Sequence, residues 1–289
     1  MRLEPKNNHH LPRILCLHGG GTSSEIFRRQ CRTLIRLLAP HFRLAFANGP
    51  YPCEVAGPDV SAVYAGCGPF RRWLRWLPEH PWVDNADGAD AIEASMQSAM
   101  AQDDAQGGHG DWVGLIGFSQ GGKVAASALL ETQVRAETAA RRPSWAADTF
   151  PMGFAGVEWR FGILLASRAP IVALSDLTMA LDGVGFPSDL FSQPPVVGDH
   201  VDNDYRLRIP SVHVHGTRDA GIKYHRALLQ DFTATTSAEL IEWEGNHRVP
   251  VKTAEVICIV EATLRAAKVR ETVPSSCHGA SGFRWRDQV

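Results

Sequence analysis

One serine in this chain has the surroundings of a reactive nucleophile. Ser119 is the centre of Gly117-Phe-Ser-Gln-Gly121, a G-x-S-x-G motif. The apolar run 112–116 before it predicts a strand, and the Ala- and Leu-rich run 123–131 after it predicts a helix. A serine at such a strand–turn–helix junction points its Oγ out of the sheet, and the flanking glycines allow close backbone approach. The motif alone is weak, so the remaining chemistry has to be found elsewhere in the chain.

A serine hydroxyl becomes a good nucleophile only when a base takes its proton and a third group orients that base. Asp219 follows the predicted strand 209–215, and His247 follows the predicted strand 239–243. Both stand just past strand ends, where the reactive groups of parallel sheets gather. The order Ser119, Asp219, His247 therefore predicts a nucleophile, an orienting acid and a general base.

Other roles for these residues remain open at this point. Asp219 could cap a helix that begins near residue 221. His247 could be an ordinary surface histidine. His213 and His215 compete as bases, but they alternate within a predicted strand and point to one face, which favours packing.

A tetrahedral intermediate also needs amide donors for its negative oxygen. One is expected from Gln120, the residue after the serine, and the other from the glycine-rich loop His18-Gly-Gly-Gly21. Gly20 is the first candidate in that loop and Gly21 the second. A phosphate-binding loop is the alternative, but the chain has neither the G-x-x-x-x-G-K-[ST] nor the G-x-G-x-x-G pattern there.

The elements that position these residues alternate along the chain. Strands are predicted at 13–17, 42–47, 112–118, 161–166, 209–215 and 239–243, and helices at 24–38, 87–103, 120–135 and 250–268. This alternation predicts an α/β fold with a parallel sheet covered on both faces, in one domain over 1–270. The segments 136–160 and 169–208 are expected to be lid-like insertions. The tail 271–289 is expected to be disordered.

Composition narrows the function classes. The 289 residues carry a net charge of −2, which argues against a nucleic-acid partner. The arginines of the first helix are expected to form a solvated face. No apolar run reaches the ~20 residues of a membrane span, and no secretory signal is visible. Six cysteines without a close C-x-x-C pair predict free thiols, no metal site and a cytoplasmic location.

Together, the motifs resemble those of the fungal FSH-type serine hydrolases. This family is related to the human ovarian-cancer-associated hydrolase and to the thioesterases of fungal polyketide gene clusters. The resemblance runs from about residue 13 to 268, and one departure is Gly122, where many members have alanine. It rests on Leu17-His-Gly-Gly-Gly-Thr-Ser-Ser-Glu-Ile-Phe27, Asn48-Gly-Pro50, Gly68-Pro-Phe-Arg-Arg-Trp73, Gly117-Phe-Ser-Gln-Gly121, His213-Val-His-Gly-Thr-Arg-Asp219 and Gly245-Asn-His247.

The resemblance implies an α/β-hydrolase fold, the triad Ser119, Asp219 and His247, and hydrolysis of an ester or a carrier-bound thioester without a cofactor. The first hypothesis is release of an acyl or polyketide chain from an acyl carrier domain. A general short-chain carboxylesterase is the second, and a non-catalytic ligand-binding protein on the same scaffold is the third. An apolar pocket for the acyl chain is expected from three aromatics: Phe70, Trp73 and Trp76.

Overall fold

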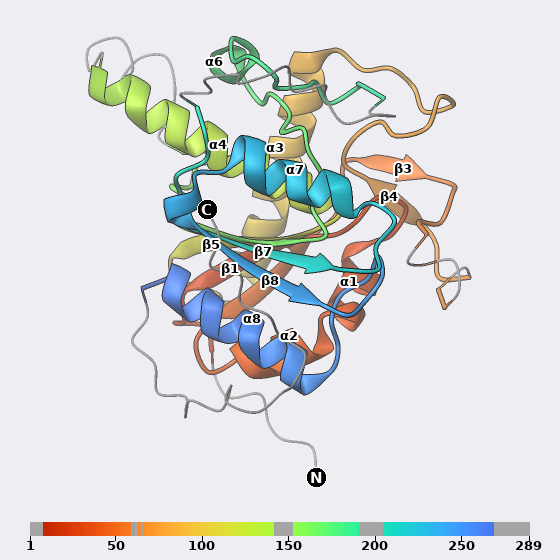
Figure 1. Ribbon diagram of the computed structural model, residues 1–289, viewed down its shortest axis with the longest axis vertical. Coiled ribbons are helices and arrows are strands. Elements are labelled where there is room, and N and C mark those ends of the chain that lie inside the picture. Colours follow the sequence, from red (N-terminus) through yellow and green to blue (C-terminus); the bar gives the residue numbers. More distant parts are fainter. Residues whose placement is uncertain are drawn as a thin grey trace.

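The central element is a parallel sheet. The computed structural model describes residues 8–58, 60, 63–64, 66–141, 153–190 and 205–268. Within these ranges the sheet has six strands in the order β2-β1-β5-β6-β7-β8, and all neighbouring strands are parallel (Figure 1). The predicted sheet is thus confirmed. Its strands are β1 (Arg13–Leu17), β2 (Arg43–Ala47), β5 (Trp112–Phe118), β6 (Phe161–Leu165), β7 (Ser211–Gly216) and β8 (Ala238–Trp243).

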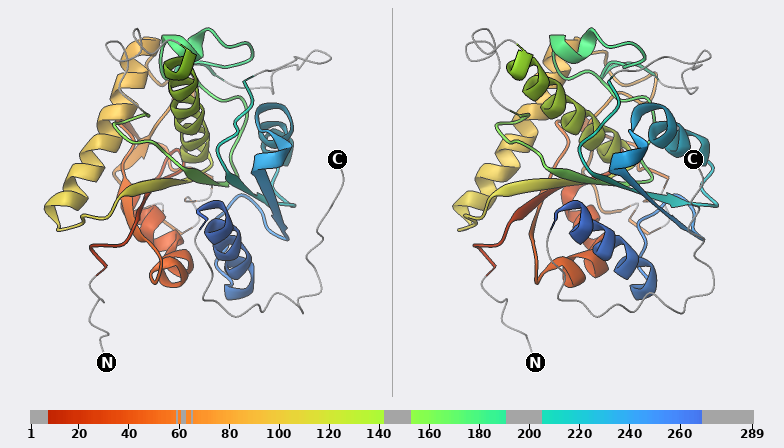
Figure 2. Two further views of the ribbon diagram at one scale, coloured as in Figure 1. Left: turned by 90° about the vertical axis from the view of Figure 1, so that its left-hand side faces the viewer. Right: turned by 60° about the vertical axis from the view of Figure 1, so that its left-hand side comes forward.

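Helices cover both faces of the sheet (Figure 2). One face carries α1 (Ser24–Gln30), α2 (Arg32–Leu38) and α8 (Thr253–Ala266). The other carries α3 (Asn85–Ala105), α4 (Gln120–Arg141) and α7 (Ile222–Phe232). In β1, Leu15 and Leu17 belong to the hydrophobic core on one face, and Ile14 and Cys16 to the core on the other. Burial on both faces explains why the central strands β1, β5 and β6 read as nearly continuous apolar runs.

The first and the last predicted helix differ from those of the structure. The helix expected over 24–38 divides at Cys31, whose φ of −81° and ψ of 9° leave the helical range. Ser23 caps its first part, because its side chain accepts a hydrogen bond from the Ile26 amide. The last helix begins at Thr253 after Lys252 as N-cap, so Pro250 lies before the helix and not in its first turn.

A short hairpin lies at the carboxyl-end side of the sheet and was not predicted. Its strands β3 (Tyr51–Cys53) and β4 (Phe70–Arg72) pair antiparallel (Figure 1). An isolated bridge joins Thr22 to Arg71 and so fastens the hairpin to the loop after β1. Each strand has only three residues, which is too short for a recognisable alternation of apolar and polar residues. Pro52 also argues against a strand, because proline has no amide hydrogen to donate.

The two expected insertions are described in part. Helix α4 continues to Arg141, so the first part of the segment 136–160 is helical. Residues 153–190 include the short helix α6 (Asp176–Met179), which packs against α4. Residues 142–152 and 191–204 and the tail 271–289 lie outside the described residues.

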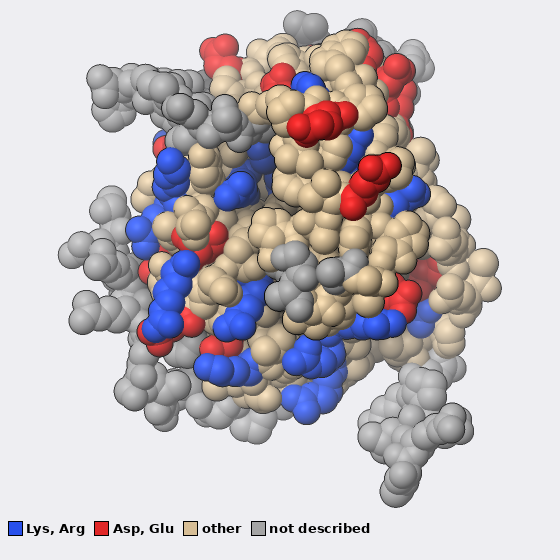
Figure 3. Space-filling model, turned by 90° about the vertical axis from the view of Figure 1, so that its right-hand side faces the viewer, with Lys and Arg blue, Asp and Glu red and all other residues tan. Residues whose placement is uncertain are grey.

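Figure 3 shows the side toward which the strands point. Lys and Arg gather in its lower half, several beside acidic side chains, and mostly uncharged side chains cover its centre. Among the described residues no disulfide joins the five cysteines Cys16, Cys31, Cys53, Cys67 and Cys258, and Cys277 lies outside these residues. Among the helices in the described ranges, none has both the length and the apolar character that a membrane span needs.

Candidate active site

Ser119 occupies a strained turn between β5 and α4. Its φ of 52° lies in the left-handed region, which a serine rarely adopts. The Ser119 amide donates to the Leu165 carbonyl of β6 at 2.8 Å, and the Ser119 carbonyl accepts from the Lys123 amide at 3.0 Å. These two bonds fix the turn to the neighbouring strand and to the first turn of α4. Backbone strain of this kind is typical of functional sites.

The glycines beside Ser119 let three backbone segments meet. A Cβ on Gly117 would overlap the Gly121 carbonyl oxygen and the Gly122 Cα atom. A Cβ on Gly121 would overlap the carbonyl oxygens of Leu17 and His18, at the end of β1. The helix can therefore start directly against β1 and β5, as the G-x-S-x-G motif predicts.

The structure brings the three predicted residues into one hydrogen-bonded chain. The His247 Nε2 atom lies 2.9 Å from Ser119 Oγ, and its Nδ1 atom lies 2.6 Å from Asp219 Oδ2. Asp219 comes from the loop between β7 and α7, and His247 from the loop between β8 and α8. The His247 side chain is 21% exposed, and its ring packs at 5.1 Å from the Phe118 ring. The imidazole is thus held at both nitrogens but open to the surface.

Asp219 is buried and held as an ionised acid. Burial raises the pKa of its carboxyl. The hydrogen bond and the charge of His247, together with the Gly221 amide, lower this pKa by more, so it lies below its usual value. The Gly221 amide donates to Oδ1 at 2.7 Å, so Asp219 also caps the turn that leads into α7. Both contacts keep the Asp219 carboxylate negatively charged, and this negative charge would stabilise a protonated His247.

The two rival histidines lie inside the core. His213 and His215 are fully buried in β7, and their ring centroids are 6.1 Å apart. Burial lowers the pKa of His213 to about 3 and holds the pKa of His215 well below its usual value. The next ring is His225 of α7, 5.6 Å from His215, and it reaches Asp219. His225 was not predicted, because nothing in its sequence setting marks it.

The loop after β1 borders the nucleophile. A Cβ on Gly19 would lie 3.6 Å from Ser119 Cβ. His18 Nδ1 donates to the Gly19 carbonyl at 2.6 Å, and His18 Nε2 accepts from the Gly49 amide at 2.9 Å. Burial lowers the pKa of His18 to about 4, so the ring is neutral and both of its nitrogens serve to shape this loop.

The two candidate glycines of that loop differ. The Gly21 amide donates to the Arg71 carbonyl at 3.0 Å, so its hydrogen is already used. Within the described ranges, no such bond is found for the amide of Gly20. The Gln120 side chain has a further role that the sequence did not indicate. Its Oε1 accepts from the Trp73 amide at 2.7 Å, and its Nε2 donates to the Leu74 carbonyl at 3.1 Å.

The three predicted pocket aromatics have different surroundings. Trp73 is 0% exposed, and its Nε1 donates to the His18 carbonyl at 2.9 Å, so this indole supports the loop after β1. Phe70 is buried in a small cluster, and the half-buried Trp76 packs against that cluster. The other buried members of the cluster are Ile26, Cys53 and Val60.

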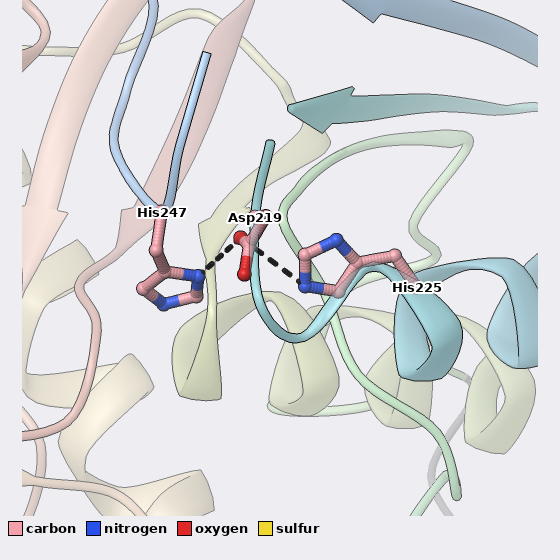
Figure 4. A group of neighbouring side chains, drawn as sticks. All are labelled: Asp219, His225 and His247. Atoms are coloured by element: carbon pink, nitrogen blue, oxygen red, sulfur yellow. Dashed lines mark hydrogen bonds and ion pairs between the residues drawn. The ribbon is translucent and has the colours of Figure 1, made fainter. Parts of the chain in front are cut away.

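One group of side chains has the spacing of a metal site. Single donor atoms of Asp219, His225 and His247 lie within 4.8 Å of one another (Figure 4). A cation bound there would need the lone pair of His247 Nδ1, whereas the contact with Asp219 needs a hydrogen on that atom. Metal binding and the hydrogen-bonded chain to Ser119 therefore exclude one another. The structure shows the hydrogen bonds from Asp219 through His247 to Ser119.

The model of a family described as serine hydrolase (FSH1) matches residues 8–258. The chain belongs to this family. It is therefore a serine hydrolase, as the resemblance implied.

Curated relatives of this serine hydrolase carry the name esterase. It is 46% identical to esterase claE of Penicillium crustosum over 262 residues, which cover 90% of this chain and 94% of the relative. It is 45% identical to esterase pigG of Monascus ruber, over 89% of this chain and 92% of that one. The solved structure of Zea mays acyl-protein thioesterase 2 is similar at a TM-score of 0.53 and 15% identity, covering 92% and 97% of the two chains. This likeness confirms the α/β-hydrolase fold.

Proposed function

We propose that Ser119 is the nucleophile, His247 the general base and Asp219 the orienting acid of an esterase or thioesterase that works through an acyl-enzyme. The observation that carries this proposal is the unbroken chain from Asp219 Oδ2 through both His247 nitrogens to Ser119 Oγ. Such a chain activates a hydroxyl and stabilises the imidazolium that results.

The reaction would run in two halves. Ser119 Oγ attacks the acyl carbon while its proton passes to His247 Nε2. The tetrahedral intermediate then collapses, the bond to the alcohol or thiol breaks, and His247 returns the proton to that leaving group. A water molecule next gives a proton to His247 and attacks the acyl-enzyme. Collapse of this second intermediate releases the acid and restores the Ser119 hydroxyl.

The negative oxygen of each intermediate would be met by two backbone amides. Gln120 supplies the first, at the start of the long helix α4, whose N-terminal dipole also favours negative charge. Gly20 is the better candidate for the second, because the Gly21 amide is already bonded to Arg71. The contacts of the Gln120 side chain with the loop at 73–74 would hold this site in shape.

For the substrate we propose an acyl or polyketide chain on the thioester of a carrier domain. The resemblance to thioesterases of polyketide clusters supports this choice. The names of the relatives favour a second candidate, a small ester without a carrier. The segment 169–190, which packs on α4 behind the nucleophile, would contribute to the acyl pocket in either case.

A fluorophosphonate probe tests the nucleophile. We expect labelling of the wild type, none of Ser119→Ala, and normal labelling of Ser98→Ala, which changes an exposed serine of α3. Ser119→Ala and His247→Ala should each lower kcat by at least about 10⁴-fold, and Asp219→Ala by less. A folded wild type that is not labelled would instead support a non-catalytic binding protein.

Side-by-side kinetics separate the two substrates. The measurement is kcat/KM for an acyl chain on a carrier domain and for the aryl ester of the same acid. We expect the carrier thioester to be preferred. Hydrolysis of the aryl ester alone would establish the small-ester candidate.

A further inference from the structure

The acid of the proposed triad is contacted by two imidazoles. Figure 4 shows Asp219 between His247 and His225. His225 Nε2 lies 3.6 Å from Asp219 Oδ2, the same oxygen that His247 Nδ1 approaches to 2.6 Å. The other oxygen, Oδ1, accepts the hydrogen bond of the Gly221 amide. Oδ2 therefore lies between two imidazoles, hydrogen-bonded to His247 and in a longer electrostatic contact with His225.

Packing alone does not account for a histidine at position 225. Its side chain is fully buried in the first turns of α7, and among the described residues neither ring nitrogen has a hydrogen-bond partner within normal range. A buried polar group without such a partner destabilises a fold, whereas a phenylalanine ring would fill similar space without that cost. The contact that distinguishes the histidine is the approach of Nε2 to Asp219.

The charge state of His225 suits this contact. Burial lowers its pKa to about 4, Asp219 raises it in part, and His247 and Arg168 lower it again. His215, the ring on its far side, is neutral as well. Near neutral pH His225 therefore offers one N–H dipole and no charge. With the hydrogen on Nε2, that dipole stabilises the ionised carboxylate and leaves its full charge for the imidazolium of His247.

We propose that His225 is a positioning residue of the active site, whose Nε2–H holds Asp219 Oδ2 in place for His247. The proposal rests on the triad proposed above. His225 acts through Asp219 and touches no reacting atom. It belongs to a buried row in which His215 and His213 follow, so the row connects the triad with the interior of β7.

Two substitutions separate the donor from the ring. His225→Phe keeps the ring and removes the donor, and His225→Gln keeps a donor at the position of Nε2. For His225→Phe we expect kcat to fall about tenfold with little change in KM, because Oδ2 is no longer held. We also expect the acid limb of kcat/KM to move to higher pH, because an Oδ2 without the nearby Nε2–H dipole attracts the proton of His247 more strongly. His225→Gln should retain most of the wild-type profile.

The matched control is His213→Phe, the same change at a buried position of the row that does not contact Asp219. Over the pH range in which both proteins stay folded, it should leave the acid limb unmoved. If His225→Phe fails to fold, His225→Asn gives the same test, because its amide is too short to reach Oδ2. A folded variant without the donor that keeps the wild-type kcat and acid limb would overturn the proposal.

A spectroscopic readout keeps this test independent of turnover. The proton shared by His247 Nδ1 and Asp219 should give a far-downfield ¹H resonance, which can be followed in the inactive Ser119→Ala background. It should shift or broaden with His225→Phe and stay in place with His213→Phe. An unchanged resonance in folded His225→Phe would count against His225 alone, whereas absent probe labelling of Ser119 would count against the proposed function.

Discussion

At the scale of single residues, the turn at Ser119 requires glycines, because an added Cβ atom would overlap neighbouring atoms. A Cβ on Gly122 would overlap Ser167 Oγ and lie 2.8 Å from Ser167 Cβ. We expect Gly122→Ala to lower the free energy of unfolding by about 1–3 kcal/mol, as overpacking does in cores. The displaced turn should also lower kcat/KM for an aryl ester. Urea unfolding and steady-state kinetics measure the two effects.

A double-mutant cycle identifies the cause. Ser167→Gly removes the overlapping atoms, so Gly122→Ala should cost much less in that background. Gly66→Ala is the matched control, because nothing lies within 4 Å of a Cβ there. Equal losses in both backgrounds would contradict the overlap as the cause.

The sequence predicted the residues whose places follow from strand ends, and missed those whose places depend on packing. Asp219 and His247 could be named because parallel strands bring their following loops to one edge. The approach of His225 to Asp219 depends on how α7 turns over the sheet, which no local pattern encodes. The use of the Gly21 amide by Arg71 depends on the hairpin β3–β4, and that hairpin was itself not predicted.

At the scale of elements, one buried polar contact joins α4 to the segment that covers it. Thr178 Oγ1 donates to Glu131 Oε2 at 2.7 Å and accepts from the Leu174 amide at 2.9 Å. Glu131 Oε1 also lies 2.6 Å from Arg135 Nε. Because Glu131 is 0% exposed, these side chains take the place of water around its carboxylate, and the hydrogen bond from Thr178 joins α6 to α4. The segment 169–190 is thus a fastened part of the fold.

Thr178→Val tests this fastening. The change keeps the shape but leaves a buried carboxylate oxygen and the Leu174 amide without this partner, so we expect a loss of about 1–3 kcal/mol. Thermal unfolding should show it, and limited proteolysis should cut within 169–190 sooner. The control is Thr263→Val in α8, whose hydroxyl bonds only within its own helix in the described structure. A protease pattern like that of the wild type would contradict the anchoring role.

Some helix ends were mispredicted because the spacing of apolar residues did not mark them. The central strands β1, β5 and β6 were found because burial on both faces makes them almost entirely apolar. The break at Cys31 went unseen because apolar positions continue across it in α1 and α2. The end of α4 was placed too early because Ala136–Arg141 has few large apolar residues, although the helix continues through them.

At the scale of the whole molecule, buried neutral histidines link stability to pH. Burial lowers the pKa of His18 and His225 to about 4 and that of His213 to about 3, from an ordinary value of 6.5. The unfolded chain therefore binds protons at a pH where the folded chain does not. The free energy of unfolding is therefore not reduced by these histidines above about pH 6.5, and it decreases as the pH falls toward 4.

This linkage predicts acid unfolding between about pH 6.5 and 4, since each such histidine can cost on the order of 3 kcal/mol and small domains have only about 5–15 kcal/mol to lose. His213→Phe should move the midpoint to lower pH, because one buried group no longer has to take up a proton. His109→Phe should leave it in place, since that ring is exposed to water. Circular dichroism across a pH series measures the midpoints. Equal midpoints for wild type and His213→Phe would show that the burial of His213 does not drive the transition.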